Sequence, residues 1–241
     1  MTPRFFVLPE AVKGGEVVLS GPDAHHACRV LRLAQGDIVT VLDGAGRVMQ
    51  TEVVGVAARE VRLAIRTETR EEPAGPAITL VQALPKGDRF EWVLQKATEL
   101  GVSAVRPVVS RRCVVRVDAG RSQQRLRRWE AIAREAAEQS ERPDLPVIHP
   151  VVALDDVPWD PKDLVLILAE RARGNALAAR LPSTPPPVLH VLVGPEGGWD
   201  PEELSTLQAR GGVCVSLGPR ILRTETAGLA ALAVIQAKYE G

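Results

Sequence analysis

The sequence predicts an α/β protein in which a small β-rich domain precedes a larger domain built on a mostly parallel sheet. Short β-favouring segments separated by glycine turns occupy about the first 70 residues. From Ala77 onward, apolar strand-like runs alternate with segments whose apolar residues recur at helical spacing. A chain of 241 residues is long enough for a small and a medium-sized domain.

The first domain is expected to contain five strands and one helix. Gly14-Gly15 and residues 43–46 supply turns, and Asp23 is expected to cap a helix whose body is His25–Arg32. Five short strands with one helix indicate a small barrel of a kind that often binds RNA. The expected strands are Arg4–Leu8, Glu16–Ser20, Ile38–Leu42, Arg47–Val56 and Glu60–Thr67.

A polar segment, 67–76, ends in proline and glycine and is expected to link two domains, 1–72 and 73–241. In the second domain the expected strands are Ile78–Leu84, Val105–Val109, Leu164–Ala169, Val188–Val193 and Val213–Leu217. The expected helices run from Asp88 to Gly101, over Gln123–Glu141, from Asp200, and over Ala227–Lys238. This alternation predicts helices on both faces of the sheet.

Two strand–loop–helix segments near the carboxyl end of the chain are expected to frame one pocket. Residues 194–198 follow one strand, and residues 218–226 follow the next. Ligands of parallel sheets bind outside the carboxyl ends of the strands. Neither loop has the spacing of a dinucleotide or phosphate loop. Glu196 would repel a phosphate and suits a cationic ligand such as a sulfonium, although a purely structural β-turn is the alternative interpretation.

Composition limits the partners and the compartment. The formal net charge is zero, so any nucleic-acid surface must be local. Cys28, Cys113 and Cys214 are scattered without metal-ligand spacing, which favours a reducing compartment and no metal site. No apolar run is long enough to span a bilayer, so a cytoplasmic location is expected, with no membrane partner.

The two loops resemble the cofactor-binding motifs of the SPOUT methyltransferases. The motifs are Gly194-Pro195-Glu196-Gly197-Gly198 and the segment Leu217–Ala227, LGPRILRTETA. The segments QKATELGV at 95–102 and EAAEQS at 135–140, with Arg4-Phe5-Phe6 and His25-His26, make the whole chain similar to the RsmE family. One departure is Ser140-Glu141, where the family pattern has a Cys-Gly or Ser-Gly type of pair.

The resemblance implies a trefoil-knotted SPOUT-type methyltransferase domain after a PUA-like β-barrel domain. It also implies a homodimer that binds S-adenosylmethionine and methylates N3 of one uridine in 16S ribosomal RNA, within the 30S subunit. Backbone groups of Leu217, Ile221 and Leu222 would hold the adenine. The implied cofactor-binding residues are Leu168, Ala169, Glu170, Gly194, Glu196, Gly197, Leu217, Gly218, Ile221, Leu222, Arg223, Thr226 and Ala227.

Methylation of uracil N3 requires an exposed base edge and loss of the N3 proton. A general base, or a cation that stabilises the anion through O2 and O4, would serve. Arg223 is the expected cation, and Glu99 or Glu138 the expected base. The alternatives are salt bridges, from Arg223 to Glu196 or Glu225 and from Glu99 to Lys96.

An arginine-rich segment, 106–134, is expected to supply a local basic surface for the RNA backbone. An ordinary solvated helix face is the alternative. The residues expected to contact RNA are Arg4, His25, Arg29, Arg32, Arg111, Arg112 and Arg142.

Two other functions stay open at this point. One is a SPOUT enzyme with another target, such as a ribose 2′-hydroxyl or another base. The other is a non-catalytic RNA-binding or ribosome-assembly factor, which would have no need of the cofactor.

Overall fold

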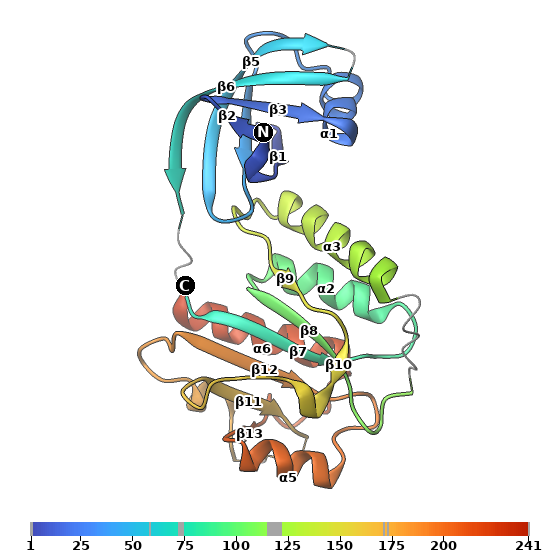
Figure 1. Ribbon diagram of the computed structural model, residues 1–241. Helices are drawn as coiled ribbons and strands as arrows, with labels where there is room; N and C mark the ends of the chain where they lie inside the picture. Colours follow the sequence, from blue (N-terminus) through green and yellow to red (C-terminus); the bar gives the residue numbers. More distant parts are fainter. Residues whose placement is uncertain are drawn as a thin grey trace. The chain divides into compact units, whose positions relative to one another are not determined.

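The computed structural model of the protein describes residues 2–57, 59–71, 75–114, 122–170, 172 and 174–240. It divides into two compact units (Figure 1). Unit 1 comprises residues up to 72 together with 137–145, and unit 2 comprises 73–136 and 146–241. Residues 137–145, which the sequence analysis assigned to the second domain, thus pack with the first unit.

Unit 1 is built on a six-stranded sheet with the order β1-β4-β5-β6-β3-β2. β1 pairs with β4 in parallel, and all other neighbours are antiparallel. The buried core includes Phe5, Leu19, Met49 and Leu63. All five predicted strands are present, and a short strand and a 3-10 turn, η1 (Pro9–Ala11), are added. The strands are β1 (Arg4–Phe6), β2 (Val12–Lys13), β3 (Glu16–Ser20), β4 (Ile38–Leu42), β5 (Arg47–Ala57) and β6 (Glu60–Arg70).

The helix of unit 1 differs from its prediction. α1 (Gly21–His25) begins before Asp23, with Ser20 as its N-cap, so Asp23 lies inside the first turn. The chain continues as a π-helix, η2 (His26–Val30), in which the Leu31 amide donates to the His26 carbonyl at 3.0 Å. The wider turn of a π-helix is a short feature that apolar spacing does not reveal.

Unit 2 is built on a parallel sheet with the order β10-β8-β7-β12-β11-β13, and β9 pairs beside β10 along β8. Figure 1 shows the central strands side by side. The strands are β7 (Ala77–Ala83), β8 (Ala104–Val109), β9 (Val147–Ile148), β10 (Val152–Ala153), β11 (Leu164–Leu168), β12 (Val188–Val193) and β13 (Val213–Val215). The helical segments are α2 (Arg89–Glu99), α3 (Ser122–Gln139), η4 (Leu154–Asp156), α4 (Leu177–Arg180), α5 (Pro201–Ala209) and α6 (Thr224–Tyr239).

Side chains of the sheet alternate between two buried cores, as expected for strands covered on both faces. Leu80 packs in the core that contains Phe90 of α2 and Leu232 of α6. Val81 packs in the other core, which contains Leu207 of α5. The prediction of helices on both faces is therefore confirmed.

Two features of unit 2 differ from the prediction. α6 begins at Thr224, so the last three residues of the predicted loop form its first turn. β9 and β10 were not predicted, because two residues are too few to show the alternation that identifies a strand.

Among the described residues, no helix is long and apolar enough to cross a membrane. The same residues contain no group of three or more potential metal ligands. All three cysteines are free thiols.

Candidate functional site

The candidate site lies where three neighbouring strands of unit 2 end. The sheet register pairs Leu168, the last residue of β11, with both Val193 of β12 and Val215 of β13. Loops that follow the carboxyl ends of adjacent parallel strands meet at one edge of the sheet. The structure thus brings together the three predicted cofactor segments, which follow β11, β12 and β13.

The glycine loop after β12 is a tight turn fixed by Trp199. The Gly198 amide donates to the Pro195 carbonyl at 2.9 Å. A Cβ at Gly194 would lie 3.1 Å from the Trp199 ring, so only glycine fits without displacing that side chain. Trp199 Nε1 donates to the Leu168 carbonyl at 3.0 Å. The ring therefore ties the end of β11 to the loop after β12.

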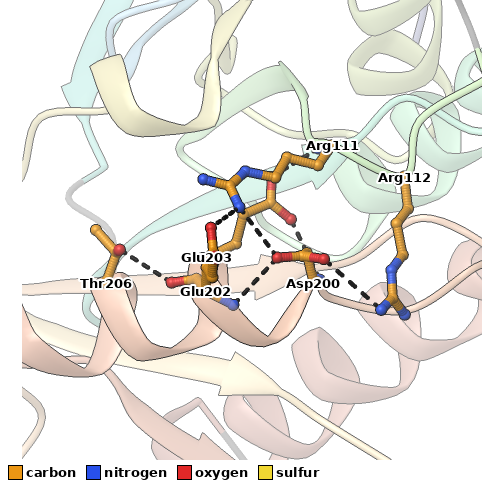
Figure 2. Close-up of polar contacts among 6 residues, drawn as sticks. All are labelled: Arg111, Arg112, Asp200, Glu202, Glu203 and Thr206. Atoms are coloured by element: carbon orange, nitrogen blue, oxygen red, sulfur yellow. Dashed lines mark hydrogen bonds and ion pairs between the residues drawn. The ribbon is translucent and has the colours of Figure 1, made fainter.

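α5 begins directly after this loop with a capping box (Figure 2). The Asp200 side chain accepts from the Glu202 amide at 3.1 Å, and the Glu203 carboxylate accepts from the Asp200 amide at 3.3 Å. Two arginines that were expected to contact RNA bind here. Arg111 pairs with Asp200 and Glu202, and the hydrogen bond with Glu202 raises the pKa of Arg111.

Arg112 holds the glycine loop itself. Its Nη1 donates to the Gly197 carbonyl at 3.0 Å, and its Nη2 lies 3.7 Å from Asp200 (Figure 2). A Cβ at Gly197 would lie 3.4 Å from the Arg112 side chain. In this structure Arg111 and Arg112 are therefore engaged with the start of α5, although both remain exposed.

The loop between β13 and α6 offers backbone groups to a ligand. Gly218 has a φ of +121°, and its amide donates to the Ser216 hydroxyl at 3.1 Å. Within the described part of the chain, the amides of Arg220, Ile221 and Leu222 donate to no protein acceptor. A planar heterocycle such as adenine carries donors and acceptors on its edge that such amides and carbonyls can satisfy. The loop thus fits an adenosyl ligand.

Glu196 also suits an adenosyl ligand, because one of its two carboxylate oxygens is free. Its Oε1 accepts from the Lys86 amide at 2.9 Å and lies 3.7 Å from Arg89 Nη1. No described residue binds its Oε2, and the side chain is 33% exposed, so this oxygen can accept from a ribose hydroxyl. The residues present therefore fit S-adenosylmethionine.

Arg89, at the start of α2, joins the loop after β12 to the start of α6 through two carboxylates. It lies 3.7 Å from Glu196 and 3.6 Å from Glu225, the second residue of α6. Sequence reasoning missed Arg89, whose position at a helix start gave no chemical signal. Arg89 thus lies beside both carboxylates that were the alternative partners of Arg223, although Oε2 of each accepts no hydrogen bond from a described residue.

The predicted catalytic residues of unit 2 lie at different ends of the sheet. Arg223 is the exposed N-cap of α6, beside the loops, and it forms no ion pair with any described residue. Glu99 is the last residue of α2, which begins at the loops and runs about 15 Å away from them. Lys96 Nζ lies 2.7 Å from the Glu99 carboxylate, which is the salt bridge named above as the alternative. Within one chain the structure does not bring Glu99 to Arg223.

Glu138 belongs to unit 1, together with Arg142 and Glu141. Arg142 is largely buried and pairs with Asp144 at 2.6 Å, whereas Arg4 pairs with Glu141 at 2.7 Å. Glu141 has a φ of +61°, in the left-handed region that favours the glycine of the family pattern. Its carboxylate thus serves as a partner for Arg4.

The other residues expected to contact RNA in unit 1 are accessible. His25 on α1, Arg29 on η2 and Arg32 are exposed. None of them forms an ion pair with a residue that the structure describes. They therefore present a group of potential cations and hydrogen-bond donors to solvent.

The arginine-rich segment is only partly available to RNA. Arg106 lies 3.2 Å from His149 Nε2, and burial lowers the pKa of both groups, with the Arg106 charge adding to the effect on His149. Arg128 pairs with Glu91 at 2.7 Å, and Arg125 lies over the Trp129 ring. Arg116 and Arg121 lie outside the described residues. Much of the predicted basic surface is therefore neutralised or used in packing.

Comparison with known proteins identifies related RNA methyltransferases that match nearly the whole chain. The RNA methyltransferase domain family matches residues 71–236, and the RNA methyltransferase PUA domain family matches residues 19–65. A protein of Synechocystis sp. named ribosomal RNA small subunit methyltransferase E is 38% identical, covering 100% of this chain and 79% of that protein. A protein of Mycobacterium bovis with the same name is 35% identical, over 92% of this chain and 86% of its own.

A solved structure is similar over nearly the full length. It is a ribosomal RNA small subunit methyltransferase E from Neisseria gonorrhoeae bound to S-adenosylmethionine, with a TM-score of 0.85 and 35% identity. The match covers 99% of this chain and 98% of that one. The fold is accordingly a SPOUT-type α/β methyltransferase domain preceded by a PUA-like domain.

Proposed function

The chain belongs to the ribosomal RNA small subunit methyltransferase E family, and from this premise we propose that it methylates N3 of one uridine in 16S ribosomal RNA. The protein is an S-adenosylmethionine-dependent ribosomal RNA methyltransferase. One observation carries the proposal. The backbone amides of the loop after β13, which donate to no described acceptor, lie directly before Arg223, an exposed cation that pairs with no described residue.

The cofactor supplies an electrophilic methyl group. The loops after β11, β12 and β13 would hold it, with backbone groups of Leu217, Ile221 and Leu222 on the adenine. Glu196 would accept from the ribose hydroxyls through its free oxygen. The remaining predicted cofactor contacts, Leu168–Glu170, Gly194, Gly197, Gly218 and Thr226-Ala227, stay part of the proposal.

The chemistry at uracil requires the N3 proton to leave as the N3–carbon bond forms and the sulfur–carbon bond breaks. Negative charge develops on O2 and O4, and a positioned cation lowers its energy in a water-poor site. We assign this role to Arg223. Glu138 is the carboxylate that we retain as general base, on the strength of the EAAEQS motif. Glu99 is disfavoured within one chain by its salt bridge and its distance along α2.

The RNA would be held mainly through its backbone. Arg29 and Arg32 are exposed and positively charged, which suits phosphate contacts that depend on salt. His25, Arg4 and Arg142 complete the proposed surface of unit 1. Arg111 and Arg112 would have to exchange carboxylate partners for phosphates, so they are the weaker members of the predicted set.

We also propose a homodimer that acts on the 30S subunit in the cytoplasm. α6 turns Ala233 and Ala237 to solvent, and Ala230 is only half-buried. An exposed apolar helix face is typical of a surface that is covered in the assembled protein. We also propose the trefoil knot, whose expected segments are in contact: Ser216 pairs with Asn175 and Leu177, and the Thr224 hydroxyl donates to the Gly194 carbonyl.

Transfer of labelled methyl groups from S-adenosylmethionine to 30S subunits lacking the modification tests the function. Nucleoside mass spectrometry is expected to detect 3-methyluridine at a single position. Detection of a different methylated nucleoside would refute uridine N3 as the target atom. The conclusions on the fold and the cofactor would still hold. Naked 16S ribosomal RNA, assayed in parallel, is expected to be the poorer substrate.

A further inference from the structure

A buried polar chain connects β7, α6 and the glycine loop. Gln82 is fully buried in β7, where register pairs it with Val193, the residue directly before Gly194. Its Nε2 donates to the Thr224 hydroxyl at 2.9 Å and to the Ala83 carbonyl at 3.0 Å. The Thr224 hydroxyl in turn donates to the Gly194 carbonyl at 2.5 Å.

This chain joins the two segments that form the candidate site. Gly194 begins the loop after β12, and Thr224 follows Arg223 at the start of α6. Because Thr224 is only 6% exposed, solvent cannot replace its hydrogen bond to Gly194 easily. The chain therefore fixes the start of α6 against the start of the loop after β12.

The arrangement leaves one polar atom without a partner. Gln82 Oε1 is buried and accepts no hydrogen bond from any described residue. A Cβ at Gly228 would lie 3.3 Å from this oxygen, so α6 packs directly on the amide. An unpaired buried acceptor is destabilising, which offsets part of what the two hydrogen bonds from Nε2 contribute to folding. The contact that links this amide to the candidate site is its hydrogen bond to Thr224.

We propose that Thr224 and Gln82 are positioning residues for S-adenosylmethionine, an inference that rests on the proposed function. Thr224 donates a hydrogen bond to the Gly194 carbonyl. Gln82 donates to the oxygen of the same hydroxyl, which directs the hydroxyl hydrogen toward Gly194. Arg223 and the backbone amides that precede it are then held in position relative to Gly194, because they adjoin Thr224 in the chain. Neither side chain touches the ligand, so their effect is exerted through the two loops.

Isothermal titration with S-adenosylmethionine tests the proposal on the full-length protein. Thr224→Val keeps the shape of the side chain and removes the hydroxyl, and the Kd is expected to rise about tenfold or more. Thr224→Ser restores the hydroxyl and is expected to bind within a few-fold of the wild type. Gln82→Met removes the hydrogen bond to the Thr224 hydroxyl and is expected to raise the Kd, with the melting temperature measured in parallel.

Thr98→Val is the matched control, because Thr98 is also buried, in α2, and its hydroxyl donates to the Leu94 carbonyl at 2.8 Å. It is expected to lower stability without changing the Kd. Unchanged Kd values for both Thr224→Val and Gln82→Met would overturn the positioning role. If Thr224→Val does not fold, Gln82→Met decides alone. A wild-type protein that binds no S-adenosylmethionine would refute the proposed function, and the positioning role with it.

Discussion

Arg223 is exposed and forms no ion pair with a described residue. Glu196 and Glu225, the carboxylates named above as its alternative partners, each lie within 4 Å of Arg89 instead. Neither carboxylate pairs with Arg223 among the described residues, so its charge is left for a substrate. The salt bridge that was the alternative interpretation of Arg223 is therefore absent among the described residues, and its role as the cation stays a proposal.

We expect Arg223→Ala to reduce methyl transfer by about a hundredfold or more while the S-adenosylmethionine Kd stays within a few-fold. The reason is that the guanidinium stabilises charge that develops on uracil, and only its backbone is proposed to border the cofactor. Single-turnover transfer and calorimetry measure the two quantities separately. Arg220→Ala, an exposed arginine of the same loop, is the control and is expected to lower transfer far less.

Measuring methyl transfer at higher pH gives a second test of the role of Arg223. Uracil loses its N3 proton unaided in more alkaline solution, so the deficit of Arg223→Ala is expected to shrink there. Loss of cofactor binding in Arg223→Ala would contradict the assigned role. An equal loss of transfer in Arg220→Ala would indicate general electrostatic attraction of RNA instead.

For single residues, the sequence indicated which side chains could carry the chemistry more reliably than it indicated which residues they contact. Glu99 was a candidate base because an anion is unfavourable at a helix C-terminus, yet Lys96 compensates it one turn earlier. Gln82 carried a usable signal, a lone amide in the apolar run Ile78–Leu84, which was read only as a strand. Partners more than a hundred residues apart, such as Gln82 and Thr224, cannot be inferred from spacing.

At the scale of elements, the start of α5 joins the glycine loop to the end of β8. Asp200 both caps the helix and pairs with Arg111 and Arg112. Asp200→Ala is expected to lower the free energy of unfolding by about 1–2 kcal/mol, the usual value for a lost N-cap. Asp200→Asn keeps the cap and loses the charge, so it is expected to recover most of that energy.

Urea denaturation measures these differences. Glu202→Ala is the control, because Glu202 pairs with Arg111 but its side chain is 78% exposed, and its loss is expected to change stability by less than about 1 kcal/mol. Equal effects of Asp200→Ala and Asp200→Asn would show that the ion pairs, and not the cap, stabilise the helix start.

The elements that the sequence predicted well are those with long patterns or strong boundary signals. β12 matched its predicted bounds, and Asp200-Pro201 marked the start of α5 correctly. The start of α6 was missed because residues 224–226 are polar and follow a glycine–proline loop, so helical periodicity begins only after them. The π-helix after α1 depends on local hydrogen bonding that apolar spacing does not encode.

At the scale of the whole molecule, a formal net charge of zero coexists with exposed, unmatched cations in unit 1. In unit 2, arginines such as Arg111 and Arg128 pair with carboxylates, whereas Arg29 and Arg32 of unit 1 are unmatched within the described residues. This distribution favours a division of labour, in which unit 1 contributes RNA affinity and unit 2 contributes the cofactor and the reacting groups.

Assembly of two chains is the remaining property of the whole molecule, and α6 offers the surface on which to test it. Ala233 is exposed on the apolar helix face that we propose to be covered in a homodimer. Ala233→Glu would bury an unpaired carboxylate there, which is costly, so dimer dissociation is expected to become at least about a hundredfold easier. Sedimentation velocity over a range of protein concentrations measures this change.

Ala209→Glu, at the exposed end of α5, is the control and is expected to leave the dimer intact. We further propose that each active site lies near the subunit interface, so methyl transfer by Ala233→Glu is expected to fall in step with its dimer fraction. An Ala233→Glu protein that remains a dimer would exclude this face of α6 from the interface.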